Sequence, residues 1–236
     1  ADIRQENVES IARREDGMFE VATSGGTVYE APTVILTAGG TPTKLEVPGE
    51  LEYAGRGVSY CAVCDGAFFK GETIAVVGGG DAAVEEAEYL TRYAEKVYVV
   101  HRRDSFRASR LLQERLFANP KIEVVWNAVL KEIHGETTVE KVTLEDTATG
   151  ETRQLATNGV FVAIGHKPTT ELFADHVNLD ENGYIIKSPD GSTRTNVEGV
   201  FAAGDVADHT YRQAVTAAGT GCMAAIDAER WLADRE

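Results

Sequence analysis

The stretch TIAVVGGGDAA, residues 73–83, decides the fold of this chain. Residues 73–77 are almost entirely apolar, which is typical of a strand buried on both faces of a parallel sheet. A glycine turn follows at once, and a helical pattern begins after it. Because Gly-x-Gly-x-x-Ala lies between a strand and a helix, the stretch predicts a dinucleotide-binding α/β unit. A glycine turn without a ligand is the alternative, which this context disfavours.

The residues of this turn suit a dinucleotide pyrophosphate. Gly78 makes the tight turn, Gly80 lets the backbone approach the phosphates, and Ala83 lets the helix pack closely on the strand. The helix N-terminus, at Asp81 and Ala82, offers free N–H groups to the phosphates. All five residues are therefore predicted to bind the cofactor.

The next strand, residues 96–100, is followed by a group of basic residues. A site that prefers NAD carries an acid at this point, to bind the ribose 2′-hydroxyl. Here His101, Arg102 and Arg103 follow the strand, and Arg107 lies one helical turn further. Arginines hold a 2′-phosphate by charge-assisted hydrogen bonds, so the sequence predicts NADPH. A solvated basic turn is the alternative, which is disfavoured in a chain of net charge −15.

The segment from Cys61 to Gly66 reads CAVCDG and predicts a redox dithiol. A dithiol that opens and closes needs a proton carrier, and Asp65 stands directly after Cys64. Zinc is disfavoured because the third cysteine, Cys222, stands alone and no two histidines have ligand spacing. A purely structural disulfide over so short a loop would stabilise little. The sequence therefore predicts no metal site.

The sequence contains a short internal repeat, in which residues 160–169 match the pattern of residues 34–43. Each copy is an apolar strand, a glycine and a Pro-Thr pair three residues on, which predicts two copies of one nucleotide-binding fold. Gly165 lies 87 residues after Gly78, so the glycine loop that matches Gly39 is expected upstream of residue 1. The strand ends of both copies are predicted to border a cofactor, at Thr37, Gly39, Ile164 and Gly165.

A third strand of this kind, residues 199–205, ends in Gly204 and Asp205. The carboxylate of Asp205 is placed to accept hydrogen bonds from ribose or ribityl hydroxyls, with a helix N-cap as the alternative. A long helix is predicted to follow residues 211–214 and to end at Leu232. Cys222 is predicted to be a buried small side chain within this helix. Further predictions are a helix over 106–118, strands at 177–179 and 184–187, and a helix near Cys64.

Composition narrows the class of protein. The chain has 236 residues, 43% of them hydrophobic, which is enough for one large or two modest cores. Its acidity disfavours nucleic acid and anionic membrane as partners. No apolar run approaches a membrane span, and no signal peptide is recognised at the start. Three cysteines in such a chain fit a reducing cytoplasm.

Together these motifs resemble the low-molecular-weight thioredoxin reductases over essentially the whole chain. The resemblance rests on residues 61–66, 78–83, 101–107 and 199–214. It implies a homodimeric flavoprotein of two Rossmann-like domains, with the NADPH domain inserted in the FAD domain. Residues 1–43 would be part of the FAD domain without its glycine loop, 44–168 the NADPH domain with the dithiol, and 169–236 the C-terminal part of the FAD domain.

The resemblance also implies a role for each site residue. Electrons would pass from NADPH to FAD, to the disulfide and to thioredoxin. Cys64 would be the sulfur nearer the flavin, Cys61 would attack thioredoxin, and Asp65 would be the acid and base. Asp205 and the run Arg212, Gln213 and Ala214 would contact FAD.

Two other functions remain open at this point. The flavoprotein subunit of alkyl hydroperoxide reductase is similar around the dithiol, but such enzymes favour NADH. A non-catalytic NADP-binding redox module is the other alternative.

Overall fold

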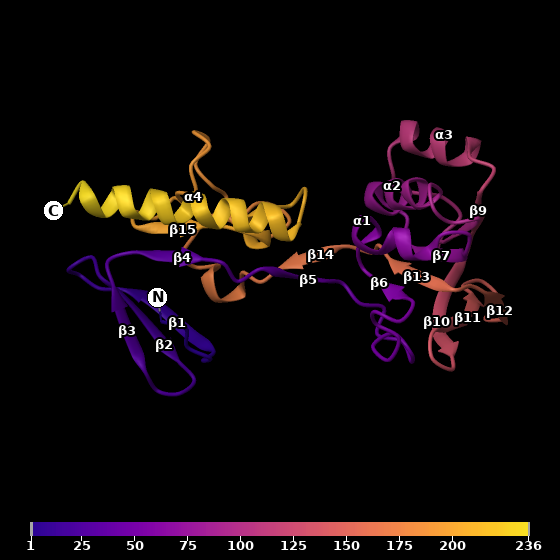
Figure 1. The fold of residues 1–236 in the computed structure, drawn as a ribbon, viewed down its shortest axis with the longest axis horizontal. Coiled ribbons are helices and arrows are strands. Elements are labelled where there is room, and N and C mark those ends of the chain that lie inside the picture. Colours follow the sequence, from indigo (N-terminus) through magenta and orange to yellow (C-terminus); the bar gives the residue numbers. More distant parts are fainter. Residues whose placement is uncertain (1, 236) are drawn as a thin grey trace. The chain divides into compact units, whose positions relative to one another are not determined.

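The computed structural model describes residues 2–235, which divide into two compact units (Figure 1). The first unit joins residues 2–41 to residues 166–235, and the second consists of residues 42–165. The sequence-based boundaries lie after residues 43 and 168. The two chain segments that connect the units pair with each other as a short sheet of β5 (Gly40–Pro42) and β14 (His166–Pro168).

A five-stranded parallel sheet forms the centre of the second unit. Its order is β6 (Val58–Ser59), β13 (Gly159–Val162), β7 (Thr73–Val77), β8 (Lys96–Val100) and β9 (Ile122–Val125). Side chains alternate between the two faces along β7, as a strand requires. Ile74 and Val76 pack on one face against α2 (Asp81–Leu90) and α3 (Arg110–Ala118).

The opposite face of this sheet is covered by an antiparallel meander. Its strands are β10 (Ala128–Gly135), β11 (Val139–Asp146) and β12 (Thr152–Ala156). Ala75 and Val77 of β7 lie in the core between the two sheets, with Leu130 and Val142 of the meander. The unit therefore has three layers, and the predicted α/β class with Rossmann-like topology is confirmed.

The dithiol lies on a short helical segment after the edge strand β6. This segment is α1 (Ala62–Asp65) followed by the 3-10 turn η1 (Gly66–Phe69). The ring of Phe69 meets Phe161 of β13 edge-to-face, with centroids 5.1 Å apart. It also covers Gly159, where an added Cβ would lie 2.8 Å from Phe69 Cδ1. The dithiol segment is thus anchored directly on the parallel sheet.

A buried carboxylate ties the connection 42–57 to the residue before the dithiol. Glu50 is 1% exposed and accepts hydrogen bonds from the backbone N–H groups of Leu45, at 2.9 Å, and Glu46, at 2.6 Å. The hydroxyl of Tyr60 donates to the same carboxylate at 3.1 Å. Burial, and then this partner, raise the pKa of Tyr60 to about 12.

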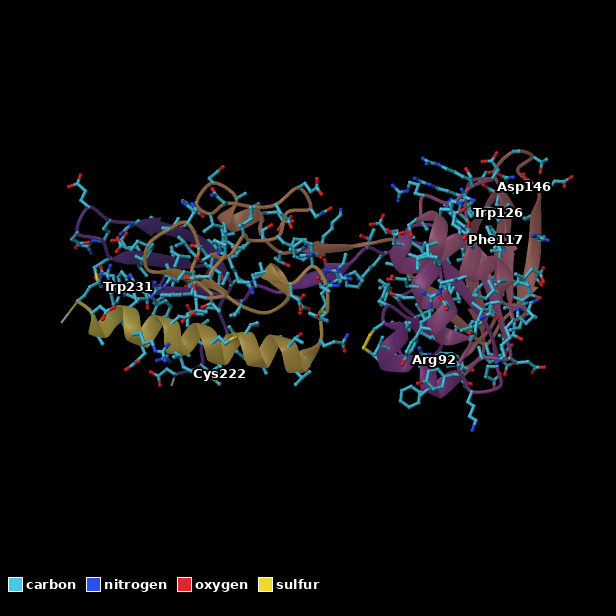
Figure 2. The ribbon with its side chains drawn as sticks, turned by 90° about the horizontal axis from the view of Figure 1, so that it is seen from above. Arg92, Phe117, Trp126, Asp146, Cys222 and Trp231 are labelled. Atoms are coloured by element: carbon cyan, nitrogen blue, oxygen red, sulfur yellow. A yellow bond between two sulfur atoms is a disulfide. The ribbon has the colours of Figure 1, made fainter. Side chains whose placement is uncertain are left out.

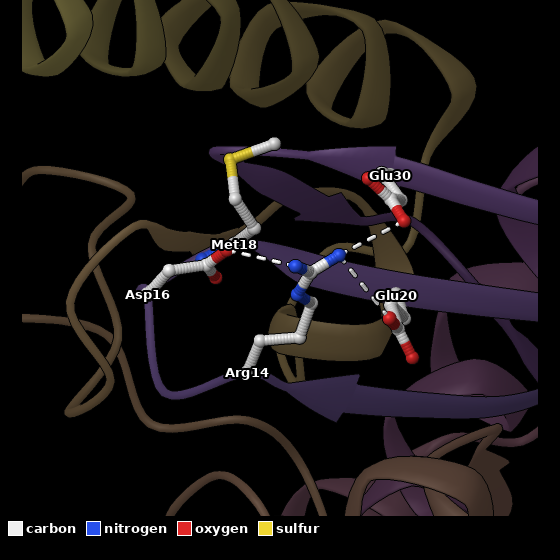
Figure 3. Close-up of polar contacts among 5 residues, drawn as sticks. All are labelled: Arg14, Asp16, Met18, Glu20 and Glu30. Atoms are coloured by element: carbon white, nitrogen blue, oxygen red, sulfur yellow. Dashed lines mark hydrogen bonds and ion pairs between the residues drawn. The ribbon is translucent and has the colours of Figure 1, made fainter.

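The first unit combines an antiparallel sheet with a short parallel pair. β1 (Val8–Arg13), β2 (Phe19–Thr23) and β3 (Val28–Ala31) form the antiparallel sheet. Figure 3 shows Arg14 at its end, with ion pairs to Asp16, Glu20 and Glu30.

The parallel pair consists of the two strands of this unit whose carboxyl ends are predicted to border FAD. β4 (Val34–Leu36) pairs with β15 (Val200–Ala202), and α4 (Ala214–Ala233) packs on them through Ala224, Ala228 and Trp231. Two 3-10 turns, η2 (Glu171–Phe173) and η3 (Asp205–Ala207), complete the unit. Within residues 2–235, no helix is both long and apolar enough to cross a membrane.

Several predicted elements differ from the structure. The helix expected from residue 106 begins at Arg110, because the N–H of Arg107 bonds the carbonyl of Gly79 and holds this segment on the glycine loop. Residues 177–179 and 184–187 share a single bridge, Leu179 to Ile185, instead of forming strands.

The helix predicted near Cys64 is present as α1, which begins at Ala62 with Cys61 as its N-cap. The prediction that Cys222 is buried was wrong. Cys222 is exposed on α4, because the buried face of this helix runs through Ala224 and Ala228 (Figure 2).

Glu50 offers a stability test. Glu50→Ala removes the acceptor for two backbone N–H groups and the Tyr60 hydroxyl, so the free energy of unfolding should fall by about 3 kcal/mol, as for hydrogen bonds to a charged group. Glu50→Gln keeps one acceptor oxygen and should lose less. Urea unfolding followed by circular dichroism measures both. Glu52→Ala, at an exposed position of the same segment, is the control, and equal stability of the two alanine variants would contradict this account.

Candidate active site

The predicted nucleotide-binding residues come together at one edge of the parallel sheet. β13, β7 and β8 are neighbours and parallel, so their carboxyl ends lie at the same edge. The predicted nucleotide-binding residues follow directly after these ends. They are Ile164 and Gly165 after β13, Gly78 to Gly80 after β7, and His101 to Arg103 after β8. Ligands of open α/β sheets bind at such an edge.

The glycine loop is closed toward the protein and open toward solvent. A Cβ on Gly78 would lie 2.6 Å from the Cβ of Ala83, so helix α2 approaches the strand as closely as predicted. A Cβ on Gly80 would meet nothing within 4 Å. The backbone at Gly80 therefore borders open space, and the residues present fit a dinucleotide pyrophosphate above the N-terminus of α2.

His101 lies under this loop instead of facing solvent. Its ring is 5.3 Å from Phe106 and 6.0 Å from Trp126, and its Nε2 donates to the carbonyl of Ser105 at 3.0 Å. Burial lowers the pKa of His101 below its ordinary value. A Cβ on Gly79 would clash with this ring, so His101 supports the backbone of the loop. Trp126 is visible next to Phe117 in Figure 2.

The three arginines are exposed around the same loop. Arg107 is held there by its backbone N–H, which donates to the Gly79 carbonyl at 2.9 Å. The carboxylate of Asp81 accepts from the backbone N–H of Ser109 at 2.7 Å, which fixes the start of α3. Among the described ion pairs none involves Arg102, Arg103 or Arg107. Their guanidinium groups are therefore available to an anionic ligand.

The dithiol lies after β6, two strands away from the glycine loop in the sheet. Cys61 and Cys64 form a disulfide with an S–S distance of 2.02 Å. The backbone N–H of Cys64 donates to Cys61 Sγ at 3.2 Å. Such a hydrogen bond favours the charged form of a sulfur, so a thiolate at Cys61 would be stabilised when the disulfide opens.

Asp65 is connected to Cys61 through a residue that the sequence analysis missed. The hydroxyl of Ser59 donates to Asp65 Oδ2 at 2.6 Å and accepts from the backbone N–H of Cys61 at 3.1 Å. Asp65 also lines a groove of about 400 Å³ with Arg56 and Phe68. The arrangement supplies a proton carrier and an open surface beside a redox disulfide.

The predicted flavin-side residues lie at the carboxyl edge of the parallel pair in the first unit. Thr37 and Gly39 follow β4, and Gly204 and Asp205 follow β15. Gly39 and Gly204 have positive φ angles of 69° and 76°, which favour glycine. The backbone N–H of Gly204 donates to Thr220 of α4 at 2.9 Å, so the turn is fixed against that helix.

Asp208 organises the loop that carries Arg212, Gln213 and Ala214. Its carboxylate accepts from the backbone N–H groups of Thr210, Tyr211 and Arg212, at 3.0, 2.9 and 3.0 Å. Burial raises the pKa of Asp208, but these hydrogen bonds outweigh it, so the pKa lies below its ordinary value. The loop holds Arg212 at a φ of 48°, with its guanidinium donating to the Tyr184 hydroxyl at 3.1 Å.

His166 faces the same part of the first unit. Its ring covers Gly40, where a Cβ would lie 3.0 Å from Nδ1, and this nitrogen has no hydrogen-bond partner among the described residues. Burial lowers the pKa of His166, and the positive charge of Arg212 acts in the same direction, while Asp205 opposes it.

The sequence offered unequal signals for the residues that were missed. An aspartate before a polar loop commonly accepts backbone N–H groups, so Asp208 could have been found. Ser59 and Glu50 carry no such signal, because their partners are set by how β6, α1 and the connection fold together.

A glycine loop at a parallel sheet edge and a Cys61–Cys64 disulfide on the same unit are the features expected of a nucleotide-dependent disulfide oxidoreductase. The comparisons agree with this class. Residues 2–221 match the model of the pyridine nucleotide-disulphide oxidoreductase family, and the chain belongs to this family.

Several relatives of the chain are thioredoxin reductases. The chain is 59% identical over 214 residues to the thioredoxin reductase of Streptomyces clavuligerus, covering 90% of this chain and 66% of that one. It is 51% identical over 234 residues to a bifunctional thioredoxin reductase/thioredoxin of Mycobacterium leprae, covering 99% and 51%. The structure of thioredoxin reductase from Streptococcus pyogenes matches with a TM-score of 0.90 and 44% identity, covering 97% and 74%.

The chain thus spans less than two thirds of the length of these two curated relatives. The thioredoxin reductase family depends on FAD and NADPH. The resemblance seen in the motifs is confirmed by these comparisons.

The Asp208 network yields a test by proteolysis. Asp208→Ala removes the acceptor for three backbone N–H groups, so the loop should open more often and trypsin should cleave after Arg212 about tenfold faster. Mass spectrometry of the fragment that ends at Arg212 measures the rate. Asp190→Ala is the matched control, because Asp190 accepts from Ser192 in another loop. Equal cleavage rates for the two variants would show that Asp208 does not hold the loop.

Proposed function

We propose that this protein acts as a thioredoxin-disulfide reductase, which passes electrons from NADPH through FAD and the Cys61–Cys64 disulfide to thioredoxin. One observation carries the proposal: the disulfide, with Asp65 connected to Cys61 through Ser59, lies on the same unit as the glycine loop and its arginines. The names of the relatives support the same activity.

Residues 42–165 are the proposed NADPH-binding domain. Gly78, Gly80 and the N-terminal turn of α2, with Asp81, Ala82 and Ala83, would hold the pyrophosphate. Arg102, Arg103 and Arg107 would bind the 2′-phosphate, and Ile164 with Gly165 would border the nicotinamide half. His101 contributes by supporting the loop from below, since its ring is buried against Gly79.

The first unit is the proposed FAD side of the protein. FAD, when bound, would supply a flavin ring that can take up a hydride from NADPH and give two electrons to the disulfide. The residues that would hold it lie after β4, after β15 and in the loop fixed by Asp208. They are Thr37, Gly39, Gly204, Asp205, Arg212, Gln213 and Ala214.

Disulfide exchange then completes the reaction on the chain's own residues. The Cys61 thiolate attacks one sulfur of the partner disulfide, a mixed disulfide forms, and the other partner sulfur leaves with a proton. The Cys64 thiolate attacks Cys61, which restores the Cys61–Cys64 bond and releases the second partner thiol. Two electrons move from the dithiol to the partner, and Asp65 is placed to deliver the protons.

The groove beside Asp65 is the proposed docking place for thioredoxin. Phe68 lines this groove and is 82% exposed, and aromatic side chains are enriched in protein–protein interfaces. Arg56 lines the same groove and can pair with an acidic or carbonyl group of the partner. The Mycobacterium relative, whose name joins a thioredoxin to the reductase, favours this class of partner. A homodimer in a reducing cytoplasm is part of the same proposal.

Cofactor choice is tested at the arginines. Replacing both Arg102 and Arg103 with alanine should weaken NADPH binding by about 1.5–3 kcal/mol for each lost charged hydrogen bond, and leave NADH binding nearly unchanged. Titration calorimetry with both nucleotides measures the difference. Arg110→Ala is the control, because Arg110 lies nearby but pairs with Glu114. Equal losses for NADPH and NADH would instead favour the hydroperoxide reductase alternative.

The role of each cysteine is tested by trapping. Both variants are made with Cys222→Ser, because the exposed Cys222 would react as well. Reduced Cys64→Ser should form a stable mixed disulfide with oxidised thioredoxin through Cys61, since no second sulfur resolves it. Reduced Cys61→Ser should trap at least tenfold less. Electrophoresis without reductant measures the product, and stronger trapping by Cys61→Ser would reverse the assignment.

A further inference from the structure

We propose that Ser59 is a positioning residue for the proton carrier, and that its hydroxyl holds the Asp65 carboxyl group beside Cys61 whether or not Asp65 carries a proton. This inference rests on the proposed function, in which Asp65 gives and takes protons during disulfide exchange. It adds a residue that lies in no motif of the sequence analysis and that lines the groove beside Asp65.

Ser59 lies at the end of β6 and is 4% exposed. Its hydroxyl oxygen is 2.6 Å from Asp65 Oδ2, 3.1 Å from the backbone nitrogen of Cys61 and 3.3 Å from the Cys61 carbonyl oxygen. The backbone N–H of Asp65 closes the ring by donating to the same carbonyl at 3.1 Å. Ser59 therefore contacts both the Asp65 carboxylate and the backbone N–H and C=O groups of Cys61.

A hydroxyl group suits this position because it both donates and accepts. It has one hydrogen and two lone pairs, and the hydrogen can rotate. With Asp65 ionised, the hydrogen points at Oδ2, and the N–H of Cys61 fills one lone pair. With Asp65 protonated, Oδ2–H donates to Ser59, and the hydroxyl hydrogen turns to the Cys61 carbonyl. The carboxyl group keeps a partner in both states without moving.

Other charged groups face the site from different elements. Arg56, from the connection, and Glu72, after η1, line the same groove as Asp65. The neighbouring side chain of Tyr60 is directed elsewhere, to Glu50. Ser59 is thus distinguished from these groups by a direct hydrogen bond of 2.6 Å to the carboxylate.

Removing the hydroxyl should therefore leave the Asp65 carboxyl group without its partner at Oδ2. The backbone N–H of Cys61 would lose its acceptor at the same time. Because a hydrogen bond to a charged group is involved, Ser59→Ala should slow the step that needs Asp65 as a proton carrier about tenfold.

The experiment measures mixed-disulfide formation with oxidised thioredoxin in the Cys64→Ser, Cys222→Ser background. Ser59→Ala should slow this reaction about tenfold, while Tyr60→Phe, which removes the next hydroxyl along the chain, should leave the rate unchanged. If Ser59→Ala does not fold, Ser59→Thr and Ser59→Val form an isosteric pair that differs only in the hydroxyl, and only Ser59→Val should be slow.

The dependence on Asp65 separates positioning from a general structural effect. Ser59→Ala should have no further effect on the rate once Asp65 is replaced by asparagine. The inference is overturned if Ser59→Ala and Ser59→Val react as fast as Tyr60→Phe, or if the slowing persists in Asp65→Asn. The same series with a small aromatic disulfide in place of thioredoxin needs no protein partner, so slowing there without any trapping of thioredoxin would contradict the proposed function alone.

Discussion

The parallel pairing of β13, β7 and β8 is the constraint on which the rest of the nucleotide unit depends. Because these strands run in one direction, three segments far apart in the sequence leave the sheet at one edge. The close contact of Gly78 with Ala83 then sets α2 against that edge, and the buried ring of His101 holds the glycine backbone from below. No single segment makes the proposed anion site. Strand direction, helix packing and the aromatic cluster around His101 together place backbone N–H groups and arginines around one open space.

The position of the dithiol segment depends on the same sheet through side-chain contacts. β6 is an edge strand of this sheet, and it ends at Ser59, whose hydroxyl bonds Asp65. The next residue, Tyr60, directs its hydroxyl to Glu50 instead. On the other side of the cysteines, Phe69 packs on β13 at Gly159 and Phe161. Three attachments thus hold a helix of a single turn, which has too few internal hydrogen bonds to be stable alone. This firm support suits a disulfide that must open and close again without losing its geometry.

Sequence patterns predicted what depends on local periodicity and missed what depends on tertiary contact. The apolar runs at 73–77 and 96–100 became β7 and β8 with the same bounds, because buried parallel strands need apolar side chains on both faces. The start of α3 was predicted too early, because nothing in the local pattern shows that Arg107 bonds the carbonyl of Gly79. Cys222 was assigned to the interior from residue type alone, although the helix turns Ala224 and Ala228 inward. Ser59 could not be found at all, since a serine before an aromatic residue is a common pair.

Asp65 and Asp208 have the same side chain but different hydrogen-bond partners, and these partners suit different roles. Asp208 accepts hydrogen bonds from three successive backbone N–H groups, which favour its ionised form, so it serves as a fixed anchor for the loop of Arg212. Asp65 is held instead by a hydroxyl, which can both donate to a carboxylate and accept from a carboxylic acid. A group held by amide donors alone would resist taking up a proton, because an amide cannot reverse its role. The hydroxyl of Ser59 therefore gives Asp65 a partner that suits both forms of a carboxyl group, whereas the amide donors around Asp208 suit the carboxylate alone. This difference follows from the chemistry of the donors and not from the acid itself.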